Sequence, residues 1–287
     1  MKRRSAFPGN GTKDARAAST FLDDAGQGAV LAPTAYLLVA SCAGGAVLFA
    51  ANMMLAARFS VAEFGHFKTV IAFFSFLPVL LEMGAGLTIV RYLSSAQSTG
   101  AFSLARRLMR MVLAAHGVGA VLLFLFRRAL AIRLLHGEVF SPLIVAGIVL
   151  FMGYYFELFK QVALGLQRYR LYALSQFLAL TASGAGAYLA GRSGGPAAAV
   201  LGWAFGYLAG NLVCAPALWQ IRRSPPTGPP VPFSAVFWGY SLPLYIMMYP
   251  GFLGLAVIPL LSLFFRQELI GYLSLAMIFY QGITALP

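Results

Sequence analysis

The stretch FKTVIAFFSFLPVLLEMGAGLTIV, residues 67–90, is almost wholly apolar and carries only two charged side chains, Lys68 and Glu82. A helix needs roughly 20 such residues to cross a bilayer. Runs of this kind recur along the chain, and we count eight: Tyr36–Ala57, Phe67–Val90, Met109–Phe126, Ser141–Leu164, Leu171–Gly191, Ala197–Trp219, Val236–Phe264 and Leu269–Pro287. They lack the ten-residue alternation of a membrane β-barrel. The sequence therefore predicts an all-α polytopic membrane protein with about eight transmembrane helices.

The composition points the same way and excludes other classes. The 287 residues are 60% hydrophobic and 10% charged, whereas soluble domains average about 45–50% and about 25%. The net charge of +13 does not indicate nucleic-acid binding, because the basic residues are scattered singly or in pairs between apolar runs. Cys42 and Cys214 lie inside such runs, and the three histidines have no ligand spacing. We expect no metal, no cofactor and no nucleic-acid partner.

Polar segments divide the chain. Residues 1–30 are predicted to form a polar cytoplasmic tail, residues 31–220 a six-helix membrane lobe, residues 221–234 a Pro-rich cytoplasmic linker, and residues 235–287 the start of a second lobe. Within the linker, RRSPPTGPPVP (residues 222–232) predicts extended chain without helix. Prolines in the seventh run predict a kink or a break there. About two thirds of the 21 Lys and Arg residues fall on one side if the N-terminus is cytoplasmic, which favours that orientation.

The first and last hairpins resemble each other. Leu55–Phe67 aligns with Leu261–Leu273, and the alignment pairs Gly65 with Gly271 and superposes the first two runs on the last two. Transporters are often built from such duplicated bundles. If the repeat unit has six helices, the second copy here holds only two. We therefore expect the chain to be the front part of a longer protein.

A family resemblance follows from three segments. Residues 57–94 (ARFSVAEFGHFKTVIAFFSFLPVLLEMGAGLTIVRYLS), residues 165–180 (GLQRYRLYALSQFLAL), and Tyr240–Leu244 together with Ile270–Tyr272 resemble bacterial lipid-linked oligosaccharide flippases. These form the polysaccharide-exporter branch of the MATE-like multidrug/oligosaccharidyl-lipid/polysaccharide superfamily. The resemblance implies a two-lobed transporter in the bacterial inner membrane that moves polyprenyl-pyrophosphate-linked glycan for exopolysaccharide, O-antigen or capsule. It also implies other polysaccharide-assembly membrane proteins as partners. The family usually has twelve to fourteen spans, so this chain departs from it in length.

Ionisable residues inside spans are the candidates for function, because charge in hydrocarbon is costly. Glu82 and Glu157 lie about 22 and 24 Å along their spans at 1.5 Å per residue, in the cytoplasmic half. Lys160 follows Glu157 at i+3 and either pairs with it or extends to the inner interface. His116 lies in the middle of the third run and is a site residue or a hydrogen-bonded packing residue.

Arg58 and Arg91 lie at span ends. They either set topology or bind the pyrophosphate of a lipid-linked sugar, whose oxygens match the planar guanidinium.

Two other functions of the protein remain open. A membrane glycosyltransferase or polysaccharide polymerase is less favoured, because the predicted outer loops are short and poor in acids. A drug/cation antiporter of the same superfamily would share the fold and differ in cargo. We favour a transporter that is not an enzyme.

Overall fold

The computed structural model describes residues 27–95, 100–223 and 231–284. About 90% of the structure is helical, and the described ranges contain no strand. Two short elements are not α-helices: η1 is a 3₁₀-helix and η2 a π-helix. The elements are α2 (Gln27–Arg58), α3 (Val61–Glu82), α4 (Ala85–Ser94), α5 (Ala101–Leu125), α6 (Arg127–Leu135), η1 (Glu138–Phe140), α7 (Ser141–Tyr154), α8 (Glu157–Gly165), α9 (Tyr169–Leu212), α10 (Ala215–Arg223), α11 (Phe233–Val236), η2 (Phe237–Ser241), α12 (Leu242–Ser262) and α13 (Gln267–Thr284).

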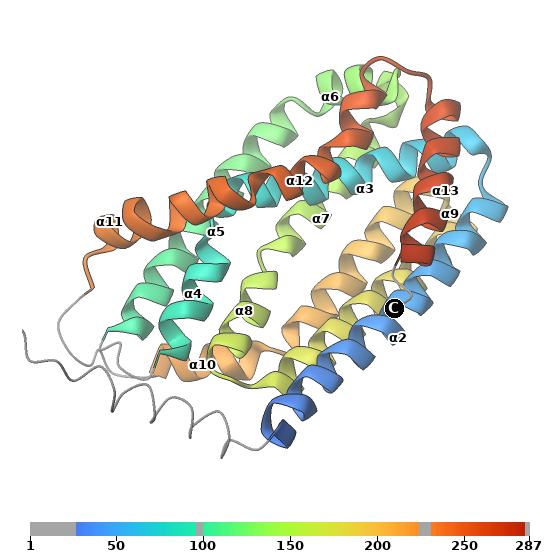
Figure 1. The fold of residues 1–287 in the computed structure, drawn as a ribbon. Coiled ribbons are helices and arrows are strands. Elements are labelled where there is room, and N and C mark those ends of the chain that lie inside the picture. The colour runs from blue at the N-terminus through green and yellow to red at the C-terminus, as the bar shows by residue number, and fades with distance from the viewer. Residues whose placement is uncertain (1–26, 96–99, 224–230, 285–287) are drawn as a thin grey trace, which may run out of the picture.

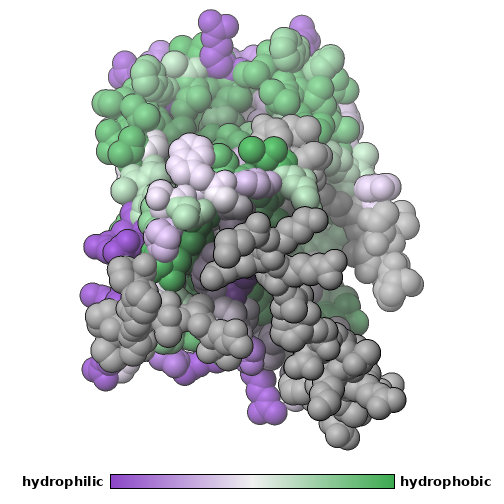
Figure 2. Space-filling view, turned by 60° about the vertical axis from the view of Figure 1, so that its left-hand side comes forward, coloured by the Kyte–Doolittle hydropathy of each residue, from purple (hydrophilic) through white to green (hydrophobic). Residues whose placement is uncertain are grey.

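The long helices run side by side between two ends of the molecule (Figure 1). One end carries α4, α10 and the start of α2, and the other carries α6 and the α12–α13 turn. Helices α12 and α13 pack on α3. Large apolar side chains such as Leu38, Val118, Val121 and Phe205 are exposed on the bundle. Figure 2 shows apolar residues over much of the upper part of this face and hydrophilic residues at its top, left and bottom edges, and such an apolar surface suits contact with lipid.

Four helices of the described chain are long and apolar enough to cross a membrane: Thr34–Arg58, Val61–Glu82, Ala101–Leu125 and Glu138–Gly165. A fifth span results if α9 and α10, which are bent by 50° relative to each other, are taken together. The expected all-helical membrane fold is thus supported, and the expected eight spans are not confirmed. In this count the predicted runs 171–191 and 197–219 give at most one span together, because both lie in the bent pair of α9 and α10.

Helix α9 consists of two antiparallel arms. Gly195, with φ 70° and ψ −165°, interrupts the helix in a conformation that only glycine adopts readily. A Cβ on Gly206 would overlap the carbonyl group of Ala182, and Ser175 Oγ donates to the Gly210 carbonyl oxygen at 2.9 Å. The small residues let the two backbones approach closely. The arms correspond to the predicted runs 171–191 and 197–219.

Helix α3 ends earlier than its apolar run predicts. Met83 (φ 45°) and Gly84 (φ 76°) are left-handed and separate α3 from α4. A Cβ on Gly84 would lie 2.6 Å from the carbonyl oxygen of Ser241, so glycine is needed there. Thr88 Oγ1 lies 2.6 Å from Ser241 Oγ. The break therefore brings α4 against η2.

The seventh run is also interrupted, although not at the prolines inside it. Its irregular part is the π-helical segment Phe237–Ser241, and α12 then continues as α-helix to Ser262. The kink or break expected in this run thus corresponds to the π-helical segment, and the helix continues through Pro250 and Pro259. The linker expectation was partly wrong, since α10 extends through Arg223. Residues 224–230 and most of the predicted tail lie outside the described residues.

Helices α3 and α13 meet at the two glycines that the sequence repeat pairs. A Cβ on Gly65 would overlap the carbonyl of Gln267, and a Cβ on Gly271 would overlap the carbonyl of Val61. In the repeat alignment Val61 is equivalent to Gln267. The contact is therefore reciprocal, as a two-fold relation between the two hairpins would make it.

Candidate functional site

A buried ion pair lies at the start of α8. The α7 helix ends at Tyr154, so that Glu157 begins α8 and Lys160 follows one turn later. Lys160 Nζ lies 3.1 Å from Glu157 Oε1. The Lys160 side chain is 3% exposed and that of Glu157 is 33% exposed. The sequence offered two places for Lys160, and the structure puts it in the ion pair inside the bundle.

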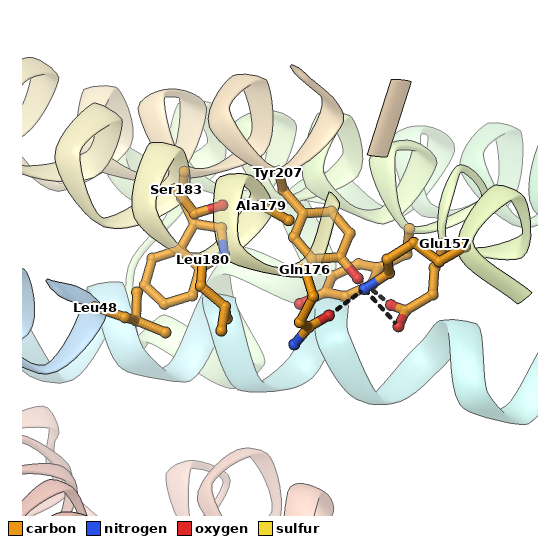
Figure 3. Close-up of a pocket in the computed structure, with 10 residues that line it drawn as sticks. Leu48, Glu157, Gln176, Ala179, Leu180, Ser183 and Tyr207 are labelled. Carbon is orange, nitrogen blue, oxygen red and sulfur yellow. Dashed lines mark hydrogen bonds and ion pairs between the residues drawn. The ribbon is translucent and has the colours of Figure 1, made fainter. Parts of the chain in front are cut away.

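Both arms of α9 supply partners to this pair (Figure 3). The Tyr207 hydroxyl donates to Glu157 Oε2, and Lys160 Nζ donates to Gln176 Oε1 at 2.8 Å. Lys160 Nζ also lies 5.6 Å from the centroid of the Tyr207 ring. The hairpin of α9 brings Gln176 and Tyr207 to the same place, because its arms are antiparallel. The charges are thus held by neutral hydrogen-bonding groups, as buried ion pairs require.

A second tyrosine supports the first. The ring of Tyr154 lies 4.6 Å from that of Tyr207, and its hydroxyl forms a 2.6 Å hydrogen bond with Ser75 Oγ. Ser75 belongs to α3 and Tyr154 to α7. The site is therefore fixed by α3, α7, α8 and both arms of α9. Side-chain positions held by several packed helices are well preorganised for binding.

The ion pair lines a cavity of about 190 Å³. Leu48, Ser183 and Trp203 line it together with Gln176 and Tyr207, and Figure 3 shows side chains from separate helices pointing into it. Ser183 is buried, and its hydroxyl has no hydrogen-bond partner among the described residues. The cavity thus has a charged part at Glu157 and Lys160 and a further polar group at Ser183. It has room for a few water molecules or a small cation.

Glu82 joins this site from another helix. It is the last residue of α3, just before the left-handed break. Its carboxylate is within electrostatic range of both Glu157 and Lys160. Glu82 is therefore close enough to the ion pair to interact with it electrostatically, although it is not among the residues that line the cavity. When all three are ionised the cluster carries a net charge of −1, which one proton or one monovalent cation would neutralise.

The other three sequence candidates lie elsewhere. Arg58 Nη2 donates to the Arg192 carbonyl oxygen at 2.6 Å and joins the end of α2 to α9. The Arg91 guanidinium lies 4.2 Å from the centroid of the Tyr240 ring. Both are exposed.

His116 is fully buried. Its Nδ1 donates to the Val112 carbonyl oxygen at 3.0 Å, and its ring stacks on Phe151 with centroids 4.8 Å apart. These contacts match the packing alternative for this histidine. Its Nε2 has no partner among the described residues.

Sequence reasoning missed the neutral partners Tyr207 and Gln176, and it treated Lys68 only as a topology residue. Lys68 Nζ donates to Asn52 Oδ1 at 2.6 Å and lies 5.9 Å from the centroid of Trp203, a residue of the cavity wall. The signal for Lys68 was its place inside the apolar run that begins at Phe67. A tyrosine and a glutamine in apolar runs give no comparable signal.

Among the described residues, no three His, Cys, Asp or Glu side chains are placed to hold a metal ion together. The polar groups at the cavity are instead one ion pair, two phenols, an amide and a hydroxyl. Such a set can exchange a proton or coordinate a small cation through oxygen atoms. Comparison with protein-family models, with curated proteins and with solved structures found no match for this chain.

Proposed function

We propose that this protein is a cation-coupled membrane transporter. The observation that carries the proposal is the Glu157–Lys160 ion pair, buried between membrane-length helices at a small polar cavity and within range of Glu82. Ionisable groups placed inside the membrane usually mark ion pathways or proton relays, because burying them without a function is costly.

The charge of the cluster supports coupling. Two carboxylates and one ammonium leave one negative charge uncompensated, and an uncompensated buried charge costs several kcal/mol. Binding of one proton or monovalent cation removes this penalty. Rearrangement of the helices could then proceed with a neutral cluster in one direction and release the cation in the other.

The cargo that we propose is a polyprenyl-pyrophosphate-linked oligosaccharide. The cavity of about 190 Å³ is too small for a glycan, so the cluster would serve as the coupling site and the cargo would pass between the two lobes. The choice of cargo rests on the resemblance of residues 57–94 and 165–180 to lipid-linked oligosaccharide flippases. The same resemblance underlies the proposed location, the bacterial inner membrane, with other polysaccharide-assembly membrane proteins as partners.

The orientation has its own test. With the N-terminus cytoplasmic, a reporter fused after Trp219 should report the inside and one fused after Gly191 the outside. The opposite pattern at both positions would reverse the proposed orientation.

Transport itself is tested with Glu82→Gln and Glu157→Gln in a glycan export assay at matched protein levels. We expect both to lower export at least tenfold, because each removes a carboxylate of the cluster. Glu138→Gln is the matched control, since Glu138 is an exposed carboxylate whose ion pair with Arg128 lies at the surface. Normal export by both cluster variants would refute the proposal.

A further inference from the structure

A second, separate feature is a rigid basic turn between α8 and α9. Gln167 has φ 57°, and the Arg168 amide donates to the Ala163 carbonyl oxygen at 2.8 Å, so the helix end is closed by local hydrogen bonds. Arg168 and Arg170 flank Tyr169 at this turn, and both arginines are exposed. The turn lies at the end of the bundle that also carries α10 (Figure 1).

The turn forms one wall of a groove of about 630 Å³, completed by Tyr36 from α2 and Pro216 from α10. The two guanidinium groups are oriented by neutral partners. Arg168 Nη2 donates to Gln220 Oε1 at 2.6 Å, and the Arg170 guanidinium lies 5.5 Å from the centroid of the Tyr36 ring. Neither arginine forms an ion pair with a carboxylate within the described ranges.

We propose that this groove binds the phosphate headgroup of an anionic phospholipid. Two guanidinium groups that have no carboxylate partner among the described residues complement a phosphodiester, whose oxygens match the planar fork of arginine. Basic pockets between transmembrane helices at the cytoplasmic side are typical headgroup sites. The volume falls within the usual range for ligand sites, about 300–1,000 Å³.

The groove's surroundings suit a lipid better than a free anion. Tyr36 and Tyr169 are aromatic residues of the kind that lie at the membrane interface. Leu38 and Val39 follow Tyr36 on α2 and are 62% and 65% exposed, which offers an apolar surface to the acyl chains. The placement in the cytoplasmic leaflet rests on the orientation proposed above, whereas headgroup binding does not depend on transport.

Binding is measured by native mass spectrometry or by titration of the detergent-purified full chain with dioleoyl phosphatidylglycerol. We expect dioleoyl phosphatidylglycerol to bind at least tenfold more tightly than dioleoyl phosphatidylcholine. The double variant Arg168→Gln/Arg170→Gln should weaken phosphatidylglycerol binding roughly thirtyfold, since each basic residue near a lipid headgroup contributes roughly fivefold. The control Arg222→Gln/Arg223→Gln removes the same charge from the same end and should change binding less than threefold.

Several results would overturn the proposal. Equal losses in the two double variants would show general charge attraction and no groove. Equal binding of the two lipids would exclude headgroup recognition. Displacement of phosphatidylglycerol by millimolar inorganic phosphate would assign the groove to free phosphate. Should the double glutamine variant aggregate, the single variants Arg168→Gln and Arg170→Gln are measured in its place, and each should weaken phosphatidylglycerol binding roughly fivefold; unchanged binding in both would also overturn the proposal. A variant that loses lipid binding but exports normally, or one that loses export but binds lipid normally, would show that this groove and the coupling cluster act independently.

Discussion

Glu157→Gln should destabilise the protein much more than removal of an exposed carboxylate. The substitution leaves the Lys160 ammonium, which is 3% exposed, without the carboxylate of its ion pair and with only neutral amide oxygens as acceptors. Breaking a buried ion pair by removing one partner costs about 3–5 kcal/mol. We expect the lower end, about 3 kcal/mol, because Glu82 still places a negative charge within range of Lys160.

Lys160→Met should lower the free energy of unfolding by less, about 2 kcal/mol. The reason is that the Glu157 side chain is one-third exposed, so that water still solvates part of its charge. The double variant Glu157→Gln/Lys160→Met leaves neither charge of the pair. Its decrease in the free energy of unfolding should therefore be about 2 kcal/mol smaller than the sum of the two single decreases. Coupling energies of this size are seen between contacting residues.

Thermal unfolding in one detergent measures these differences. A loss of 1 kcal/mol lowers Tm by roughly 2–4 °C in chains of this size, so Glu157→Gln should lower it by roughly 6–12 °C. Glu138→Gln is the control, because the Arg128–Glu138 pair is 72% and 57% exposed and contributes about 0–1 kcal/mol. A Tm for Glu157→Gln within 1 °C of that control, or simple additivity in the double variant, would refute the reasoning.

Two further predictions concern helix contacts. Gly206→Ala should cost about 1–3 kcal/mol, because the new Cβ overlaps the Ala182 carbonyl and pushes the arms of α9 apart. Gly45→Ala, where no atom lies within 4 Å of the new Cβ, should leave Tm unchanged; equal effects of the two substitutions would contradict the close packing. Thr88→Cys/Ser241→Cys, in a background without the two native cysteines, should form a disulfide on oxidation, since the native hydroxyl oxygens are 2.6 Å apart. Mass-tagging of free thiols measures the yield, and failure to cross-link would contradict the α4–η2 contact.

Local properties of the sequence could be predicted well. Apolar length and composition belong to each segment by itself, so the all-helical membrane class follows without knowledge of any contact. The i+3 spacing of Glu157 and Lys160 is likewise local, and it led to the ion pair that the structure contains. The intramembrane position of Glu82 also marked it as a candidate.

Positions that depend on distant contacts could not be predicted. The left-handed residues Met83 and Gly84 interrupt an apolar run that looks continuous, because Gly84 must approach the Ser241 carbonyl oxygen closely. The tight turn at Gly195 folds the two arms of α9 against each other. Apolar content does not indicate either event, because both depend on contacts with helices far away in the sequence.

The sequence by itself determined that the chain is a bundle of apolar helices and that a few ionisable residues lie inside them. Tertiary structure alone decided which of these residues meet. Glu82 comes near Glu157 and Lys160 because α4, which follows it in the chain, packs on α8, and Gln176 and Tyr207 contact the pair because the α9 hairpin is antiparallel. The physical reason is that helix length and polarity are set by neighbours along the chain, whereas the partners of a buried charge are set by glycine-mediated approach between helices far apart in sequence.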